Sequence, residues 1–121
     1  MAGTLHCTVM TPEGKVFEGD VDMVVATGAD GQIGILPKHA PLITALGAGV
    51  LRAKSGSGEE HWLVIGGFLE VLGEDVIVLA HKLERLEDID LAQAEKDAAG
   101  GGDKELVAAA RARVNYAKNF K

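Results

Sequence analysis

The stretch 61–80, HWLVIGGFLEVLGEDVIVLA, decides how this chain of 121 residues is interpreted. Two apolar runs, 68–72 and 76–80, flank the short turn sequence Gly73-Glu74-Asp75. Strand-forming runs on either side of a glycine-containing turn are typical of a β-hairpin. The centre of the chain is therefore predicted to consist of antiparallel strands.

Further strand signals lie upstream of this hairpin. Residues 50–54 and 61–65 flank a loop of serine, glycine and glutamate, which predicts a second hairpin. Residues 5–10 alternate between apolar and mostly polar side chains, and the sequence Thr11-Pro12-Glu13-Gly14 that follows suits a type I turn. Many short strands with closely spaced turns favour an antiparallel β-sandwich or barrel.

The pattern changes after about residue 85, where alanine-rich helical segments replace the alternating ones. Acidic residues at 87–90 suit a helix start, Gly100-Gly101-Gly102 ends that helix, and Asp103 can cap a second one. The sequence predicts a mainly β domain over residues 1–84 and an α-helical hairpin over residues 85–121.

The second predicted helix has one narrow apolar stripe. Its members are Leu106, Ala110, Val114 and Ala117. Each alanine methyl contributes about 0.8 kcal/mol at most when buried, whereas ordering each residue costs about 1–2 kcal/mol. We therefore expect that the hairpin can detach from the β domain.

Composition and charge restrict the function classes. The net charge is −6, but residues 106–121 carry four Lys or Arg and no acidic residue. An acidic body with a short basic end argues against nucleic-acid binding by the main domain. The single cysteine, Cys7, suits a reducing compartment. With no apolar run long enough to span a bilayer and no signal-peptide pattern, we expect a cytoplasmic, soluble chain.

No enzymatic motif is found. The four histidines lack the spacing of a metal site, and the glycine-rich segment 28–34 lacks the ending of a phosphate-binding loop. Cys7 lies in a predicted strand, where a small buried side chain is the expected role. These observations predict no catalytic residue, metal or cofactor. They favour a β domain with a helical tail that is a binding part of something larger. The alternative is a stand-alone β-barrel that binds a small ligand, similar to a cupin.

The stretch 31–43, GQIGILPKHAPLI, closely resembles the signature of the epsilon subunits of bacterial and chloroplast F-type ATP synthases, G-E-[IL]-G-[IV]-[LY]-P-x-H-x-P-L. It departs at Gln32, where the family often has glutamate. The blocks GGFLEV (66–71) with VIVLA (76–80), and VMTPEGKVFEG (9–19), are also similar and occur in the same order. The resemblance covers nearly the whole chain.

This resemblance implies a β-sandwich of about ten strands followed by two helices, and a non-catalytic role in the central stalk. The epsilon subunit binds the gamma subunit and the c-ring, and its helices can extend towards the alpha and beta subunits and restrain ATP hydrolysis. The implied location is peripheral, on the cytoplasmic face of a bacterial membrane, with a plastid thylakoid as the alternative.

Two groups of interface residues follow from the resemblance. Two prolines and the apolar run 40–43 are expected to form a stiff surface loop that docks with little loss of entropy. The predicted c-ring and gamma interface consists of Gln32, Lys38, His39, Pro41 and Leu42. For His39 the alternative is a hydrogen bond within the turn. The predicted inhibitory positions on the last helix, which could equally be a solvated face, are Arg111, Arg113, Lys118 and Lys121.

Some epsilon subunits bind ATP through the motif [I/L]-D-x-x-R-A. The matching positions are Ile89, Asp90, Gln93 and Ala94. Glutamine replaces the arginine here, and its neutral amide cannot match the planar, charged fork that suits a phosphate. We expect weak or no ATP binding, with Asp90 acting mainly at the start of the helix.

Overall fold

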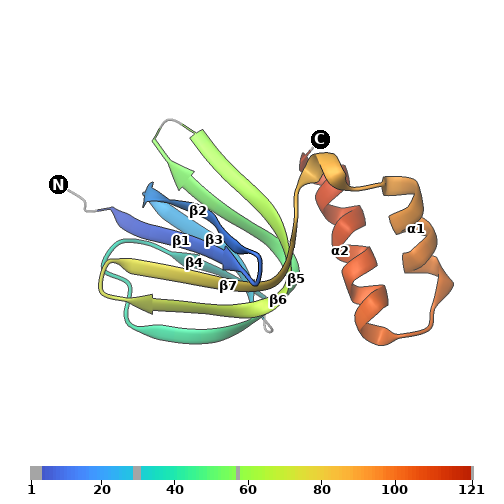
Figure 1. Cartoon of the computed structure of the whole chain (residues 1–121), viewed down its shortest axis with the longest axis horizontal. Coiled ribbons are helices and arrows are strands. Elements are labelled where there is room, and N and C mark those ends of the chain that lie inside the picture. Colours follow the sequence, from blue (N-terminus) through green and yellow to red (C-terminus); the bar gives the residue numbers. More distant parts are fainter. Residues whose placement is uncertain (1–3, 29–30, 57, 121) are drawn as a thin grey trace.

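The computed structural model describes residues 4–28, 31–56 and 58–120, which form seven strands and two α-helices (Figure 1). The strands are β1 (Leu5–Thr11), β2 (Gly14–Val21), β3 (Met23–Gly28), β4 (Gly31–Ile35), β5 (Leu42–Ser55), β6 (Gly58–Leu72) and β7 (Asp75–Glu84). A short 3-10 turn, η1 (Leu86–Asp88), leads to α1 (Leu91–Gly100) and α2 (Lys104–Phe120). The predicted mainly β fold with two C-terminal helices is confirmed.

The strands form one folded sheet in the order β2-β1-β7-β6-β5-β3-β4. Both predicted hairpins, β5–β6 and β6–β7, are present and antiparallel. The predicted antiparallel arrangement holds for every strand pair except one, since β1 and β7 run parallel. These strands lie far apart in the sequence, so no tight turn fixes their relative direction.

The described residues form seven strands rather than about ten, because β5 and β6 stay continuous where they bend between the layers of the sandwich (Figure 1). The β5–β6 register skips at Gly47 and Gly66. Gly66 and Gly67 have φ angles of +77° and +140°, and a Cβ atom on Gly67 would lie 2.1 Å from the carbonyl oxygen of Leu79. Only glycine fits this close strand approach without strain.

All seven strands contribute to one apolar core. Trp62, Leu5, Val24 and Leu69 are each at most 1% exposed. Fully burying a side chain of this size contributes about 1.5–3 kcal/mol. Cys7 is part of this core as predicted, and burial raises the pKa of its thiol to about 11.

The stretch 31–43 is not a loop throughout. Residues 31–35 form β4, an edge strand paired with β3, and Leu42 and Ile43 already belong to β5. Only residues 36–41 connect the two strands, so both prolines lie where no ladder hydrogen bond is required.

Both helices start at the acidic residues from which the sequence predicted them. Oδ1 of Asp90 accepts a hydrogen bond from the N–H of Gln93 at 3.1 Å, and Oδ1 of Asp103 accepts one from the N–H of Glu105 at 2.8 Å. Both are N-cap contacts. α2 lies against β5 and β6, and α1 packs on its far side (Figure 1).

The predicted apolar stripe of α2 is only partly correct. Ala110 and Ala117 are buried, but Leu106 is 69% exposed. The face of α2 towards the sheet instead carries Tyr116, which is fully buried and packs in one cluster with Leu63 of β6. A buried aromatic ring removes far more apolar area from water than alanine methyl groups, so α2 is held more firmly than the sequence indicated.

Candidate functional site

The loop 36–41 forms a tight turn at one end of the sandwich. The N–H of His39 donates to the carbonyl oxygen of Leu36 at 3.1 Å, and Lys38 has a positive φ of 69°. Nδ1 of His39 donates to the carbonyl oxygen of Ala40 at 2.7 Å. The alternative stated for His39, a hydrogen bond within the turn, is therefore present.

The structure does not gather the five predicted interface residues at one place. Gln32, on β4, lines a groove beside α2 together with Asn115. Pro41 and Leu42 instead border a hollow that they share with Glu70 of β6. The predicted interface is thus divided between two regions of the surface.

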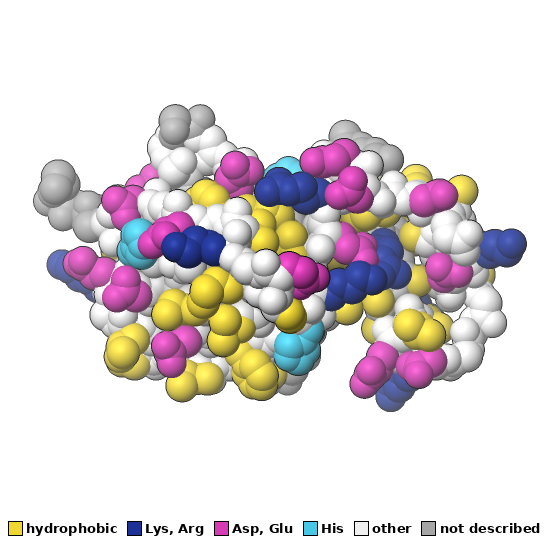
Figure 2. Space-filling model, in the orientation of Figure 1, with side chains coloured by type: hydrophobic (Ala, Val, Ile, Leu, Met, Phe, Trp, Pro, Cys, Tyr) yellow, Lys and Arg dark blue, Asp and Glu magenta, His cyan; other side chains and the backbone are white. Residues whose placement is uncertain are grey.

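The outer face of β1, β5, β6 and β7 carries a cluster of apolar side chains that was not predicted from the sequence. We call it the apolar face; its members are Met10, Ile43, Ala45, Phe68, Leu72, Ile77 and Leu79. Phe68 and Leu79 are paired across β6 and β7 and are each 48% exposed, Leu72 is 62% exposed and Ile43 70% exposed. Figure 2 shows hydrophobic side chains gathered over the region where Figure 1 places β6 and β7. Contiguous exposed apolar surface is typical of sites that contact a protein, a membrane or a ligand.

A signal for this face was present in the sequence. Phe68, Leu69, Val71 and Leu72 occupy both faces of one strand, although the outer face of an antiparallel sheet is usually polar. A strand that is apolar on both faces is either buried on both sides or covered by a partner.

Charged side chains border the apolar face at the β1–β2 edge. The His6 ring contacts Glu18 (Nε2–Oε2, 2.7 Å) and Asp20 (Nδ1–Oδ1, 3.2 Å). Hydrogen bonds to Glu18 and Asp20 raise the pKa of His6, and hydrogen bonds from Lys15 and His6 lower the pKa of Glu18. Because these groups are exposed, their ion pairs add little to the stability of the fold, but they place charge at the edge of the apolar face.

The C-terminal part of α2 is anchored to the sheet by two polar contacts. Arg113 donates to Glu84, the last residue of β7, through Nε (2.7 Å) and a terminal nitrogen (2.8 Å). The hydroxyl of Tyr116 lies 2.6 Å from Nδ1 of His61, and the ring of Phe120 packs against that imidazole at a centroid distance of 4.9 Å. Of the predicted inhibitory positions, Arg113 is therefore engaged within the chain.

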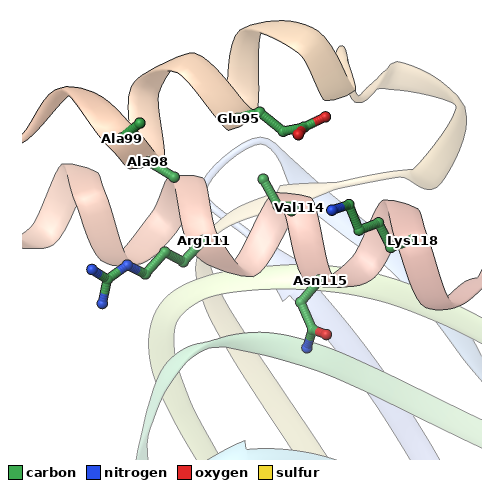
Figure 3. A pocket seen from close by; sticks show the side chains of 7 residues that line it. All are labelled: Glu95, Ala98, Ala99, Arg111, Val114, Asn115 and Lys118. Carbon is green, nitrogen blue, oxygen red and sulfur yellow. The ribbon is translucent and has the colours of Figure 1, made fainter.

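Two other predicted inhibitory residues are exposed on α2. Arg111 and Lys118 line a shallow cavity between the helices, which Glu95 of α1 also lines (Figure 3). The fourth, Lys121, lies outside the described residues. The cavity thus combines two cations with one carboxylate.

The four residues at the degenerate ATP motif support α1 locally. Asp90 caps the helix, and Ile89 and Ala94 are 8% and 2% exposed. The side-chain amide of Gln93 donates to Asp97 at 2.9 Å. The predicted role of Asp90 at the helix start is confirmed.

Two features of other protein classes are not found in the described part of the chain. Across residues 4–28, 31–56 and 58–120, no three His, Cys, Asp or Glu side chains are grouped so that they could hold a metal ion. Neither α1 nor α2 is long and apolar enough to cross a bilayer.

Comparison with known proteins identifies close relatives. Residues 4–86 match the family described as "ATP synthase, Delta/Epsilon chain, beta-sandwich domain". The ATP synthase epsilon chain of Alkalihalophilus pseudofirmus is 47% identical over 98 residues, covering 79% of this chain and 74% of the relative. That of Halalkalibacterium halodurans is 42% identical over 113 residues, covering 93% and 84%.

Solved structures share the fold at low identity. A chain of the Euglena gracilis mitochondrial ATP synthase aligns with a TM-score of 0.72 at 18% identity, covering 94% of this chain and 77% of that one. A chain of the Tetrahymena thermophila enzyme, in a structure of its central stalk and c-ring, aligns with a TM-score of 0.67 at 19% identity, covering 94% and 91%. The prediction of an epsilon-type chain, rather than a stand-alone ligand-binding barrel, is confirmed. The chain belongs to the epsilon chains of ATP synthase, which are non-catalytic subunits of that enzyme.

Proposed function

We propose that this epsilon chain is a rotor part of the F1 central stalk. It fastens to the gamma subunit through the apolar face and meets the c-ring through the loop 36–41 and the neighbouring surface. Its helical hairpin restrains ATP hydrolysis when it leaves the sheet. The observation that carries the proposal is the exposed apolar face in a member of this family.

Gamma is the partner proposed for the apolar face. A rotor connection must persist through many turns, so it needs a large, well-packed and mainly apolar interface. Phe68 and Leu79 are proposed as its main anchors, because a few large, well-packed side chains carry most of the energy at such contacts. The sheet beneath is rigid, so little conformational entropy is lost on docking.

The loop 36–41 is proposed to face the c-ring. The two prolines and the tight turn at Lys38 fix its shape before it binds. Lys38 and His39 present charge and hydrogen-bonding capacity to polar groups of the ring. Through this contact the chain would be held at the cytoplasmic face of a bacterial membrane, as a peripheral part of the complex.

The hairpin 85–121 is proposed as a brake on hydrolysis. Arg111 and Lys118 are exposed and could meet acidic side chains of the beta subunit, whereas Arg113 becomes available only when its contact with Glu84 opens. Exposed ion pairs give about 0–1 kcal/mol each, so such a brake would be weak and sensitive to salt.

The test uses F1 from which epsilon has been removed, with the full chain added back. The double variant Phe68→Ser with Leu79→Ser removes two paired side chains of the apolar face, each 48% exposed, and Leu106→Ser removes a leucine from α2 that is more exposed still, at 69%, as the control. We expect wild type and the control to bind gamma and the double variant to bind at least a hundredfold more weakly. Equal binding by all three proteins, each shown to be folded by circular dichroism, would refute the proposed docking face.

A further inference from the structure

Glu70 interrupts the apolar face at its centre. It lies between Ile43 of β5 and Ile77 of β7 in the strand register, and between Phe68 and Leu72 along β6. Its side chain is half-buried by these neighbours. None of the ion pairs or side-chain hydrogen bonds found among the described residues includes it.

A carboxylate at this position strongly restricts what can cover the face. Closing an apolar surface over Glu70 would remove its charge from water, which costs several kcal/mol unless the charge is paired and hydrogen-bonded. Within the described residues this charge has no ion-pair partner: Lys15 of β2 is bound to Glu18, and Lys82 of β7 lies 3.4 Å from Glu84.

The rest of this surface adds negative charge. Asp75, opposite Leu72 in the register, is also exposed, and Asp20 lies in the same row of the sheet beyond His6. The partner surface therefore has to be apolar over most of its area and positive opposite Glu70.

We propose that Glu70 is the specificity-determining residue of the apolar face, and that the docking segment of gamma places a lysine or arginine against it. The inference rests on the proposed docking of gamma and adds the chemistry of the docked segment. The aliphatic stem of such a side chain can lie on Phe68 or Ile43 while its charged end reaches the carboxylate. An arginine would also bind it in bidentate fashion. The pair selects the register of the docked segment, because any shift leaves a buried charge unpaired.

The test compares three full-length proteins in binding to the cognate gamma subunit by titration calorimetry. Glu70→Gln keeps the shape and one acceptor oxygen of the side chain, replaces the other oxygen by an NH2 donor and removes the charge. Glu70→Leu also removes its polarity. Glu60→Gln changes an exposed glutamate on the same strand, outside the apolar face, and is the matched control.

The direction in which the Kd for gamma changes decides whether a cation lies opposite Glu70. With a cation opposite Glu70, both variants leave that cation buried and unpaired, and we expect the Kd to rise at least tenfold for Glu70→Gln and further for Glu70→Leu. Glu60→Gln should change the Kd less than twofold. If the docked surface holds no cation, neutralising Glu70 relieves an unfavourable burial, and both variants should bind as tightly as wild type or more tightly. That result would overturn the proposal.

The Phe68→Ser with Leu79→Ser variant separates this inference from the proposed function. If it abolishes binding while Glu70→Gln does not weaken it, the apolar docking face stands and only the cation is rejected. If wild type itself does not bind gamma, the proposed function fails and the inference fails with it.

Discussion

The ion pair between Glu84 and Arg113 is predicted to control how firmly the helical hairpin rests on the sheet. Glu84 ends β7, immediately before the connection to the helices, and Arg113 lies on the docked face of α2. The side chains are 16% and 23% exposed, and the contact is bidentate at 2.7 and 2.8 Å. Replacing Glu84 by glutamine removes the charge at almost constant size.

The free energy lost when the Glu84–Arg113 pair is broken is expected to lie between two limits. Fully exposed pairs contribute about 0–1 kcal/mol, and breaking a fully buried pair costs about 3–5 kcal/mol. For side chains that are mostly covered but at the edge of the interface, we expect about 1–2 kcal/mol. Since 1.4 kcal/mol corresponds to a factor of about ten, the population in which α2 has opened should rise roughly 5–30-fold.

The pH dependence has a definite sign. The hydrogen bond from Arg113 lowers the pKa of the Glu84 carboxyl in the docked state. The stabilisation is therefore fully present above the ordinary glutamate pKa of about 4.3. It is lost as the pH falls through the lowered value, where the carboxylate becomes protonated. Glu84→Gln should remove this part of the acid sensitivity.

Hydrogen exchange followed by mass spectrometry tests the prediction. Amides of α2 should exchange faster in Glu84→Gln than in wild type, whereas amides of β1 and β7 should not change. Lys82→Gln is the control, because Lys82 contacts the same carboxylate at 3.4 Å from a more exposed position and should change exchange less than twofold. Unchanged exchange of α2 in Glu84→Gln would refute the reasoning, as would an equal loss of protection in the sheet, which would indicate global destabilisation.

Three further outcomes follow from burial and close approach. Gly67→Ala should destabilise the chain by about 4 kcal/mol or more in urea unfolding, because its Cβ would meet the carbonyl oxygen of Leu79 at 2.1 Å; a loss below 1 kcal/mol would contradict the close approach of β6 and β7 at Gly67. Burial raises the pKa of Tyr116, the single tyrosine, to about 12, so absorbance at 295 nm should titrate near that value. Docking of α2 should accordingly weaken as the pH rises above the ordinary tyrosine pKa of about 10, and a midpoint near 10 in the folded chain would contradict burial of the phenol. Cys7 should not react with a thiol reagent at pH 8 until urea unfolds the chain, since its buried thiol has a pKa of about 11; rapid labelling of the native chain would contradict this.

The parts of the fold that could be predicted depend on local chemistry. Alternating side chains at Leu5, Cys7 and Val9 predict a half-buried strand, because one face must turn to the core. Asp90 and Asp103 predict helix starts, because unpaired backbone N–H groups need an acceptor within two or three residues. Neither inference requires knowledge of distant contacts.

The features that could not be predicted depend on partners far along the chain. Leu106 and Tyr116 are both compatible with a helical apolar face, but only contact with the sheet decides that the tyrosine is buried and the leucine exposed. Arg113 and Glu84 lie 29 residues apart, and no local pattern connects them. The outer side chains Phe68 and Leu79 look like core residues in the sequence, and only the strand register places them on the outer face.

These long-range contacts together alter the expectation of a loosely held hairpin. Its alanine-rich contacts alone could not offset the entropy of ordering two helices, but Tyr116 and the Arg113–Glu84 pair add an apolar anchor and a charged anchor on the same face of α2. Under the proposed braking role, Arg113 cannot bind Glu84 and an acidic side chain of beta at the same time. Docked and extended states would then compete for one guanidinium, and the strength of the brake would depend on the difference between two ion pairs rather than on either one. Glu84, the last residue of β7, would therefore set the resting balance between the two states without contacting beta.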